Sequence, residues 1–164
     1  MFPFRGLGGI CYLCPMQALN FPQYSFRAKN NENKPSIFDV VRKKFVRLTP
    51  EEWVRQHVVH HLQKDLGYPL SLINVERKIA INGTIKRYDI VVYQPDGGIH
   101  LMVECKAPQI KISQQTFDQI ARYNLELRSK YLMVTNGLEH YYCTMDYEAE
   151  KYNFLREIPA YRNL

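Results

Sequence analysis

Three apolar, β-prone runs in residues 72–107 leave this chain few ways to fold. The first run ends at Asn82-Gly83, a dipeptide typical of a two-residue hairpin turn. The second ends in the turn-forming segment Gln94-Pro95-Asp96-Gly97-Gly98, and the third ends at Pro108, which cannot donate a ladder hydrogen bond. The sequence therefore predicts three consecutive antiparallel strands, at residues 72–81, 84–93 and 99–107.

Helical patterns stand on both sides of these strands. Thr49-Pro50-Glu51-Glu52 is typical of a helix start, with Thr49 as N-cap and Pro50 at the first position. Glu52 occupies the capping-box position, from which its carboxylate would reach back to the Thr49 backbone N–H. The helix is expected to end near Gly67. A second helix is predicted from an N-cap at Ser113 to about Ser129, with these side chains facing inward: Phe117, Ile120, Ala121, Asn124 and Leu127.

Further β-prone segments flank this central part. Residues 24–29 and 35–48 are separated by a polar turn, which favours a hairpin. A short buried strand is expected at residues 131–135, and another hairpin at residues 140–154. A mixed central sheet flanked by helices is the natural way to bury these apolar faces. The predicted fold class is therefore α/β, with three layers.

Length and composition fit one globular domain. The 164 residues are 46% hydrophobic and 23% charged, and Lys plus Arg exceed Asp plus Glu by 22 − 16 = 6, which mildly favours polyanionic partners. We expect an N-terminal extension at residues 1–22 and one domain at residues 23–164. Cys11 and Cys14 form a CxxC without a second metal-binding pair, so free thiols in a reducing cytoplasm are favoured over a zinc or redox site. Met16 is an alternative start to Met1, and no segment resembles a signal peptide or membrane span.

Charged residues inside the second and third predicted strands are the most informative feature. Asp89 lies within Tyr88–Tyr93, and Glu104 and Lys106 lie within Leu101–Ala107. Glu104 and Lys106 are two apart and so share a strand face. A turn centred on Asp96-Gly97 pairs residues whose numbers sum to roughly 193, so Asp89 and Glu104 become cross-strand neighbours about 5 Å apart.

Two carboxylates at that distance repel by roughly 3 kcal/mol at an effective dielectric constant near 20. A lysine relieves part of this repulsion and a divalent cation relieves more, and an oxygen-only pair suits Mg²⁺. A nuclease needs these groups, because the metal polarises the phosphate and helps ionise a water while the ammonium offsets charge. A buried ion-pair cluster without catalysis is the alternative, since structural ion networks mimic such sites.

The motif resembles a known nuclease superfamily. Asp89 followed by Glu104-Cys105-Lys106 matches the PD-(D/E)XK pattern, although Arg87-Tyr88 stands where a proline often precedes the aspartate. Gln119 and Tyr123 form a QxxxY on the following helix, which could also be an exposed Gln and a half-buried Tyr. The segments TPEEWVRQH, KRYDIVVY, VECKAP, FDQIARYN and VTNGLEHYYC make the chain similar to the N-terminal nuclease domain of type I restriction endonuclease R subunits, in the short stand-alone form found in bacteria.

This resemblance implies a restriction-endonuclease-like fold and assigns roles to residues. Asp89, Glu104 and the backbone carbonyl of Cys105 would bind Mg²⁺ or Mn²⁺, and Lys106 would be the catalytic cation. Gln119 and Tyr123 would contact DNA or steady the site. The family also uses an acidic residue from the first helix, and Glu51 and Glu52 compete for this role. Helical periodicity favours Glu51, which lies on the stripe of Val54 and Val58.

Other polar residues are weaker candidates. Lys86 and Arg87 precede Asp89 and could bind phosphate as part of a nucleic-acid contact. His57 and His61 are spaced as an i, i+4 pair, but no HExxH accompanies them, so structural or surface histidines are favoured.

The expected activity is a Mg²⁺-dependent deoxyribonuclease, an endonuclease that hydrolyses phosphodiester bonds and leaves 5′-phosphate and 3′-hydroxyl ends. DNA is the expected partner, together with restriction or repair protein subunits. The sequence contains no GxxxxGK[ST] motif, the phosphate-binding loop of nucleoside-triphosphate-driven motors. The alternative is a non-catalytic nucleic-acid-binding or assembly module that retains the nuclease fold. The sequence leaves the oligomeric state open.

Overall fold

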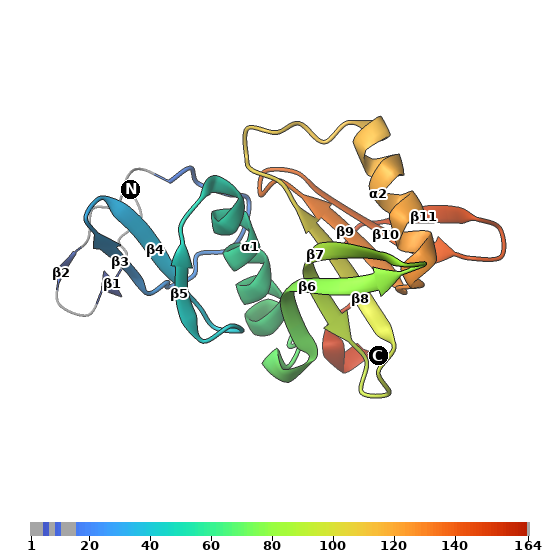
Figure 1. Ribbon diagram of the computed structural model, residues 1–164, viewed down its shortest axis with the longest axis horizontal. Helices are drawn as coiled ribbons and strands as arrows, with labels where there is room; N and C mark the ends of the chain where they lie inside the picture. The colour runs from blue at the N-terminus through green and yellow to red at the C-terminus, as the bar shows by residue number, and fades with distance from the viewer. Residues whose placement is uncertain (1–4, 7–8, 11–15, 164) are drawn as a thin grey trace.

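The computed structural model describes residues 5–6, 9–10 and 16–163. Two sheets lie on opposite sides of helix α1, Pro50–His60 (Figure 1). A three-stranded sheet lies on the N-terminal side, and a six-stranded sheet forms the centre of the molecule, with helix α2, Gln114–Leu127, on its other face. The minor strands β1, Arg5–Gly6, and β2, Gly9–Ile10, pair with each other.

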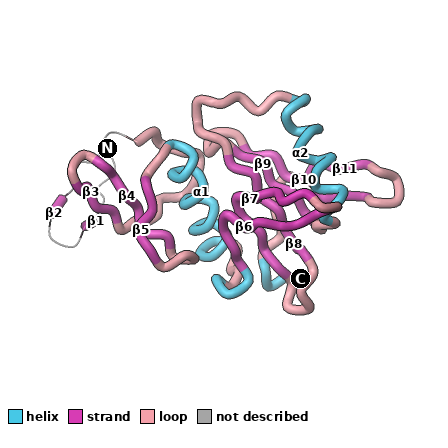
Figure 2. The backbone as a smooth tube through the Cα atoms, in the orientation of Figure 1, coloured by secondary structure: helices cyan, strands magenta, loops and turns pink. Residues whose placement is uncertain are grey.

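The central sheet is mixed, as expected. Its spatial order is β11-β10-β9-β8-β7-β6, and only the β8–β9 pair is parallel (Figure 2). The strand bounds are β6 Ile73–Ile81, β7 Thr84–Tyr93, β8 Ile99–Cys105, β9 Tyr131–Thr135, β10 His140–Asp146 and β11 Lys151–Leu155. The predicted meander, the short strand after it and the C-terminal hairpin are therefore confirmed to within two residues.

The two faces of the sheet are covered by different helices, which produces the predicted layers. Ile90 and Val103 face α1 and belong to the core cluster that contains Val54 and Val58. Val91 and Met102 face α2 and pack near Phe117. This alternation is what a strand covered on both faces requires, because successive side chains point to opposite sides. Thr49 caps α1 and Ser113 caps α2, with their hydroxyls accepting the backbone N–H groups of Glu52 and Thr116.

The N-terminal sheet is more extensive than the predicted hairpin. It consists of β3, Ala28–Asn31, β4, Lys34–Asp39, and β5, Lys44–Arg47, all antiparallel. Residues 35–48 therefore supply two strands, whereas residues 24–27 lie outside a strand. Ile37 and Trp53 belong to the cluster that joins this sheet to α1.

Helix α1 is consequently enclosed from two sides. Residues Glu52 to His60 are all buried, and beyond them the helix widens into a π-helical turn, His61–Asp65. His57 and His60 bond to the backbone carbonyl oxygens of Trp53 and Gln56 through Nδ1. These two histidines are therefore structural. Residues before the three-stranded sheet also contact α1, because the Trp53 indole N–H donates to the Gln17 carbonyl oxygen. The domain boundary at residue 22 stays a prediction.

Cys11 and Cys14 lie outside the described residues. Cys105 and Cys143 are buried free thiols. Within the described part of the chain, no helix is both long and apolar enough to cross a membrane.

Candidate active site

The predicted pairing of the two acidic strands is confirmed. Ile90 pairs with Val103 and Val91 with Met102, so paired numbers sum to 193. The ladder ends at Ile90–Val103, so Asp89 and Glu104 are the next residues on the two strands and would be opposite each other if the same register continued. The Asp89 charge contributes to raising the pKa of Glu104, which agrees with two neighbouring carboxylates.

The regular alternation of β7 breaks at Asp89. Tyr88 and Val91 both pack beneath α2, although three positions apart, whereas Ile90 packs beneath α1. On β6, Glu76 falls in a gap of the ladder and has a positive φ of 50°. Because of this break, Asp89 reaches both the helix and the neighbouring strand: Oδ1 accepts from Arg55 Nη2 at 2.7 Å, and Oδ2 accepts the Cys105 backbone N–H at 2.7 Å.

Glu104 and Lys106 form an ion pair at the mouth of the site. The Lys106 Nζ to Glu104 Oε1 distance is 2.8 Å, and the two side chains are 29% and 26% exposed. Burial, followed by the Asp89 charge, raises the pKa of Glu104, and Lys106 only partly opposes this. Burial alone would lower the pKa of Lys106, but Glu104 and Asp89 raise it overall. Lys106 therefore remains an ammonium group at neutral pH.

The two acids at the start of α1 have different surroundings. The Glu52 carboxylate is buried and accepts from Arg42, Arg55 and Gln56. It therefore does not form the predicted capping box, because these buried donors hold both of its oxygens. Glu51 is 46% exposed, so periodicity overstated its burial, and it lies 3.1 Å from Arg55.

The Glu51 charge nevertheless acts on the centre of the site. The Glu51 charge contributes to the raised pKa values of both Glu104 and Lys106, after the larger effects of burial, Asp89 and the Glu104–Lys106 pair itself. Glu52 is held by three buried donors and Glu51 is partly exposed, so Glu51 is the freer of the two acids, and its role at the site stays a prediction.

A buried ionic network behind the site was not predicted. Arg55, only 5% exposed in its side chain, ion-pairs with Asp89 and Glu52, and lies 3.8 Å from Glu76. Arg42 joins Glu52 to Glu76 and also holds Asp39. Despite the cost of burial, Asp89 and Glu52 raise the pKa of Arg55, so it stays charged. The Glu–Arg spacing on α1 is one local hint of this network, but Arg42 and Glu76 come from distant segments.

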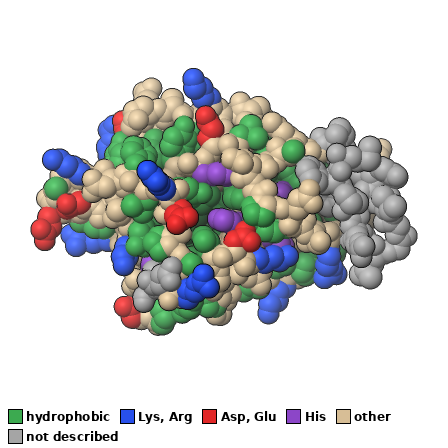
Figure 3. Space-filling model, turned by 180° about the vertical axis from the view of Figure 1, so that it is seen from behind, with side chains coloured by type: hydrophobic (Ala, Val, Ile, Leu, Met, Phe, Trp, Pro, Cys, Tyr) green, Lys and Arg blue, Asp and Glu red, His purple; other side chains and the backbone are tan. Residues whose placement is uncertain are grey.

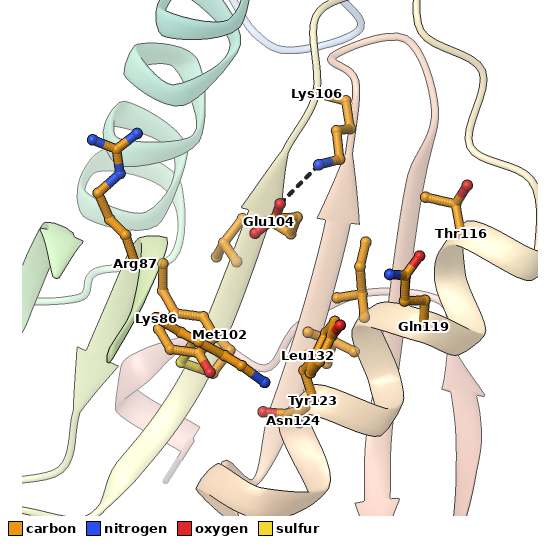
Figure 4. Close-up of a pocket in the computed structure, with 13 residues that line it drawn as sticks. Lys86, Arg87, Met102, Glu104, Lys106, Thr116, Gln119, Tyr123, Asn124 and Leu132 are labelled. Atoms are coloured by element: carbon orange, nitrogen blue, oxygen red, sulfur yellow. Dashed lines mark hydrogen bonds and ion pairs between the residues drawn. The ribbon is translucent and has the colours of Figure 1, made fainter. Parts of the chain in front are cut away.

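A cleft of about 430 Å³ opens between the β7–β8 strands and α2 (Figure 4). Glu104 and Lys106 line one side, and the predicted nucleic-acid contacts Gln119, Tyr123 and Lys86 line the same cleft. Gln119 is exposed and Tyr123 is 42% exposed. The Lys86 Nζ lies 3.6 Å from the centroid of the Tyr123 ring.

Arg87 also lines the cleft but turns away from α2 (Figure 4). Its guanidinium is 3.7 Å from Glu76, and its side chain is 64% exposed. Asp89 and Glu51 are not among the residues that line the cleft. The structure therefore brings Glu104, Lys106 and the α2 residues together and places Asp89 directly behind them.

Residues 50–159 match the protein family described as the type I restriction enzyme R protein N terminus. The chain belongs to this family.

Two solved structures resemble this member of the R-protein N-terminal family. One is a fragment of a protein assigned as an HsdR subunit of a type I restriction enzyme from Vibrio vulnificus, with a TM-score of 0.48 and 22% identity. The other is a protein assigned as a nuclease from Anabaena variabilis, with a TM-score of 0.45 and 10% identity. The first match covers 69% of this chain but 24% of the Vibrio chain, and the second covers 79% and 80%. No curated protein matches the sequence.

The donor set of this R-protein N-terminal domain fits a hard divalent cation. Asp89 and Glu104 supply carboxylate oxygens, and Mg²⁺ binds through one or two carboxylates while keeping several waters. Both Asp89 oxygens already accept one hydrogen bond, but each has a further lone pair. Within the described residues, no group of three or more His, Cys, Asp or Glu side chains could hold a metal ion. The backbone carbonyl oxygen of Cys105, next to Glu104, is one candidate for a third protein ligand.

Cys105 can offer only its carbonyl oxygen to such a cation. Its thiol is buried in the core beneath α1. Burial and the Asp89 charge raise the pKa of this thiol well above its usual range, so no thiolate is present near neutral pH.

Two buried polar atoms of cleft residues make no hydrogen bond within the described part of the protein. The buried Tyr88 Oη and Asn124 Nδ2 both belong to cleft residues, and neither atom has a hydrogen-bond partner in the described part of the protein. Buried polar groups are almost always paired, so unpaired ones in a cleft indicate room for a polar ligand. Sequence reasoning missed both residues, because Tyr88 resembles a core aromatic and Asn124 resembles an inward helix position.

Proposed function

We propose that this chain is a Mg²⁺- or Mn²⁺-dependent deoxyribonuclease that hydrolyses phosphodiester bonds within DNA. One observation carries the proposal: Asp89 bonds to the Cys105 N–H between Glu104 and Lys106, and Lys106 is ion-paired to Glu104 beside a cleft that contains Gln119 and Tyr123. Membership of the R-protein N-terminal family supports it.

The cation and the ammonium group would divide the chemistry between them. Asp89, Glu104 and the Cys105 carbonyl would hold the cation, which supplies Lewis-acid polarisation of the phosphate and a more acidic water. Lys106 is charged and next to Glu104, so it would stabilise negative charge on the phosphate or orient the attacking water.

Further residues would handle the substrate and its charge. Glu51 would act as the outer acid from α1. Gln119 and Tyr123 would position the nucleic acid in the cleft. Lys86 and Arg87, which also line the cleft, would bind its phosphates.

Other parts of the proposal follow from the family rather than from geometry. In a type I system, restriction or other protein subunits would be partners of this chain. A cytoplasmic location, where chromosomal and foreign DNA are both accessible, is part of the same proposal.

The test is cleavage of linear and supercoiled DNA with Mg²⁺ or Mn²⁺ by the wild type and Lys106→Met. Loss of this charge should slow cleavage by about 10²- to 10³-fold, because it removes one electrostatic contact to the transition state. Lys130→Met removes the same charge from an exposed position and is the matched control. Asp89→Ala is a poor test, because it leaves buried Arg55 short of one partner.

The alternative has one observation in its favour. Asp89 already pairs with Arg55, so the acids could belong to a structural ion network in a nucleic-acid-binding or assembly module. In that case a folded wild type would bind DNA without cutting it, and Lys106→Met would change neither property. Cleavage lost while DNA affinity is kept would support the nuclease.

A further inference from the structure

The outer face of the three-stranded sheet carries an unusual set of side chains. Side chains of cross-strand partners lie on the same face of a sheet. The partners Lys29–Ser36–Arg47 and Phe38–Phe45 therefore share one face, opposite the buried side chain of Ile37. We define the outer face as the outward residues of these strands together with Arg27: Arg27, Lys29, Asn31, Lys34, Ser36, Phe38, Phe45 and Arg47.

This face is strongly basic. Four of its eight residues are Lys or Arg, none is acidic, and all four cations are exposed. Glu32 lies in the turn beyond these positions. On the side of the molecule seen in Figure 3, Lys and Arg side chains are scattered among acidic, polar and apolar ones. Four like charges on one small sheet repel one another, and a bound polyanion would relieve that repulsion.

Two phenylalanines are interleaved with these cations. Phe38 and Phe45 are only partly buried, and their ring centroids are 5.3 Å apart with an interplanar angle of 69°. The Arg27 guanidinium carbon lies 4.3 Å from the Phe38 centroid, and the Lys29 Nζ lies 4.3 Å from the Phe45 centroid. These cations lie over the ring faces, so a base would stack on a ring by displacing the cation, which would then be free to bind a neighbouring phosphate.

We propose that the outer face binds single-stranded nucleic acid, with two bases stacked on Phe38 and Phe45 and the backbone held by Arg27, Lys29 and Arg47. Unpaired bases present the flat faces that stack on aromatic side chains, whereas a duplex hides them. The opposite face of this sheet packs on α1 through Trp53, so the outer face points away from the cleft. It is a second site, and its binding does not depend on cleavage.

The experiment measures the affinity of the whole chain for a fluorescent oligothymidylate, with EDTA present so that metal-dependent cleavage plays no part. The variant R27Q/K29Q/R47Q should lower the slope of log K against log salt by about 2, since each phosphate contact on a single strand contributes about 0.7. The control K64Q/K151Q/R156Q removes three exposed charges from other elements and should leave the slope unchanged.

A second variant tests stacking without changing charge. F38L/F45L keeps apolar side chains but removes both rings, and should weaken binding about fivefold or more at constant salt slope. Melting temperatures of all variants establish that they fold. An unchanged affinity in F38L/F45L would overturn the proposal in favour of a general polyanion surface, such as one that binds anionic lipid vesicles. Loss of binding only in K86Q/R87Q would overturn it too, because the oligonucleotide would then lie in the cleft.

Discussion

The buried network makes Arg55→Met the most informative single substitution. Methionine keeps most of the alkyl contacts of Arg55 but removes the charge that pairs with Asp89 and Glu52. Removing one partner of a buried ion pair costs about 3–5 kcal/mol. Arg42 still pairs with Glu52, and the Cys105 N–H still bonds to Asp89, so the lower end applies.

A loss of about 3 kcal/mol corresponds to a decrease in Tm of about 6–12 °C for a domain of this size. Urea unfolding followed by circular dichroism would measure the free energy, and thermal unfolding would measure Tm. Arg87→Met is the matched control, because Arg87 is 64% exposed and its ion pair with Glu76 is 3.7 Å long. Such a surface pair contributes about 0–1 kcal/mol.

The same pair of variants tests whether Asp89 is available to a cation. Arg55 and a divalent cation would compete for Asp89, so millimolar Mg²⁺ should raise the Tm of Arg55→Met more than that of the wild type. If Arg55→Met is no less stable than Arg87→Met, the network is not a coupled buried cluster and the reasoning is refuted.

Two further substitutions follow from the pKa shifts. Burial and the Asp89 charge raise the pKa of Glu104, so the ionised form of Glu104 opposes folding at neutral pH. Glu104→Gln should therefore keep or raise the Tm measured without metal, and should abolish the Mg²⁺-dependent increase in Tm. A clear fall in the metal-free Tm would contradict this expectation. Burial lowers the pKa of His57 from 6.5 to about 4. As the pH falls from 6.5 to 4, the unfolded chain therefore binds a proton at His57 before the folded chain does. The free energy of unfolding should decrease by about 3 kcal/mol over this pH range. His57→Phe should flatten this dependence in urea titrations at several pH values, and an unchanged slope would assign it to other groups.

The sequence was sufficient for the parts of the site that depend on local chain geometry. The turn after β7 predicts an antiparallel β7–β8 pair with a register sum near 193, which the pairs from Val92–Leu101 to Ile90–Val103 have. Next to the turn, Tyr93 pairs with Ile99, and an irregularity between Val92 and Tyr93 shifts the register by one residue. The Ser113 cap and the spacing of Gln119 and Tyr123 place two side chains on one side of α2. These features depend on short-range rules of turns, caps and periodicity.

The network behind the site depends largely on contacts between distant segments, and the Glu–Arg spacing on α1 indicates only a small part of it. Arg42 stands just after β4, and Glu76 stands on β6, yet the two side chains are 2.6 Å apart. The misassigned role of Glu52 has the same origin. The capping-box rule considers only the helix start, whereas Arg42 and Arg55 provide stronger, charged donors.

The enclosure of α1 has a consequence for how this domain can be divided. The family match begins at residue 50, which is the first residue of the helix. A fragment cut there would lose Arg42 and the sheet that covers Trp53. It would also expose one side of α1, a helix on which Arg55 and Gln56 are buried in the whole chain. We therefore expect residues 50–159 alone to be less stable than the whole chain, because the N-terminal sheet supplies Arg42 and covers the helix on which the site is built.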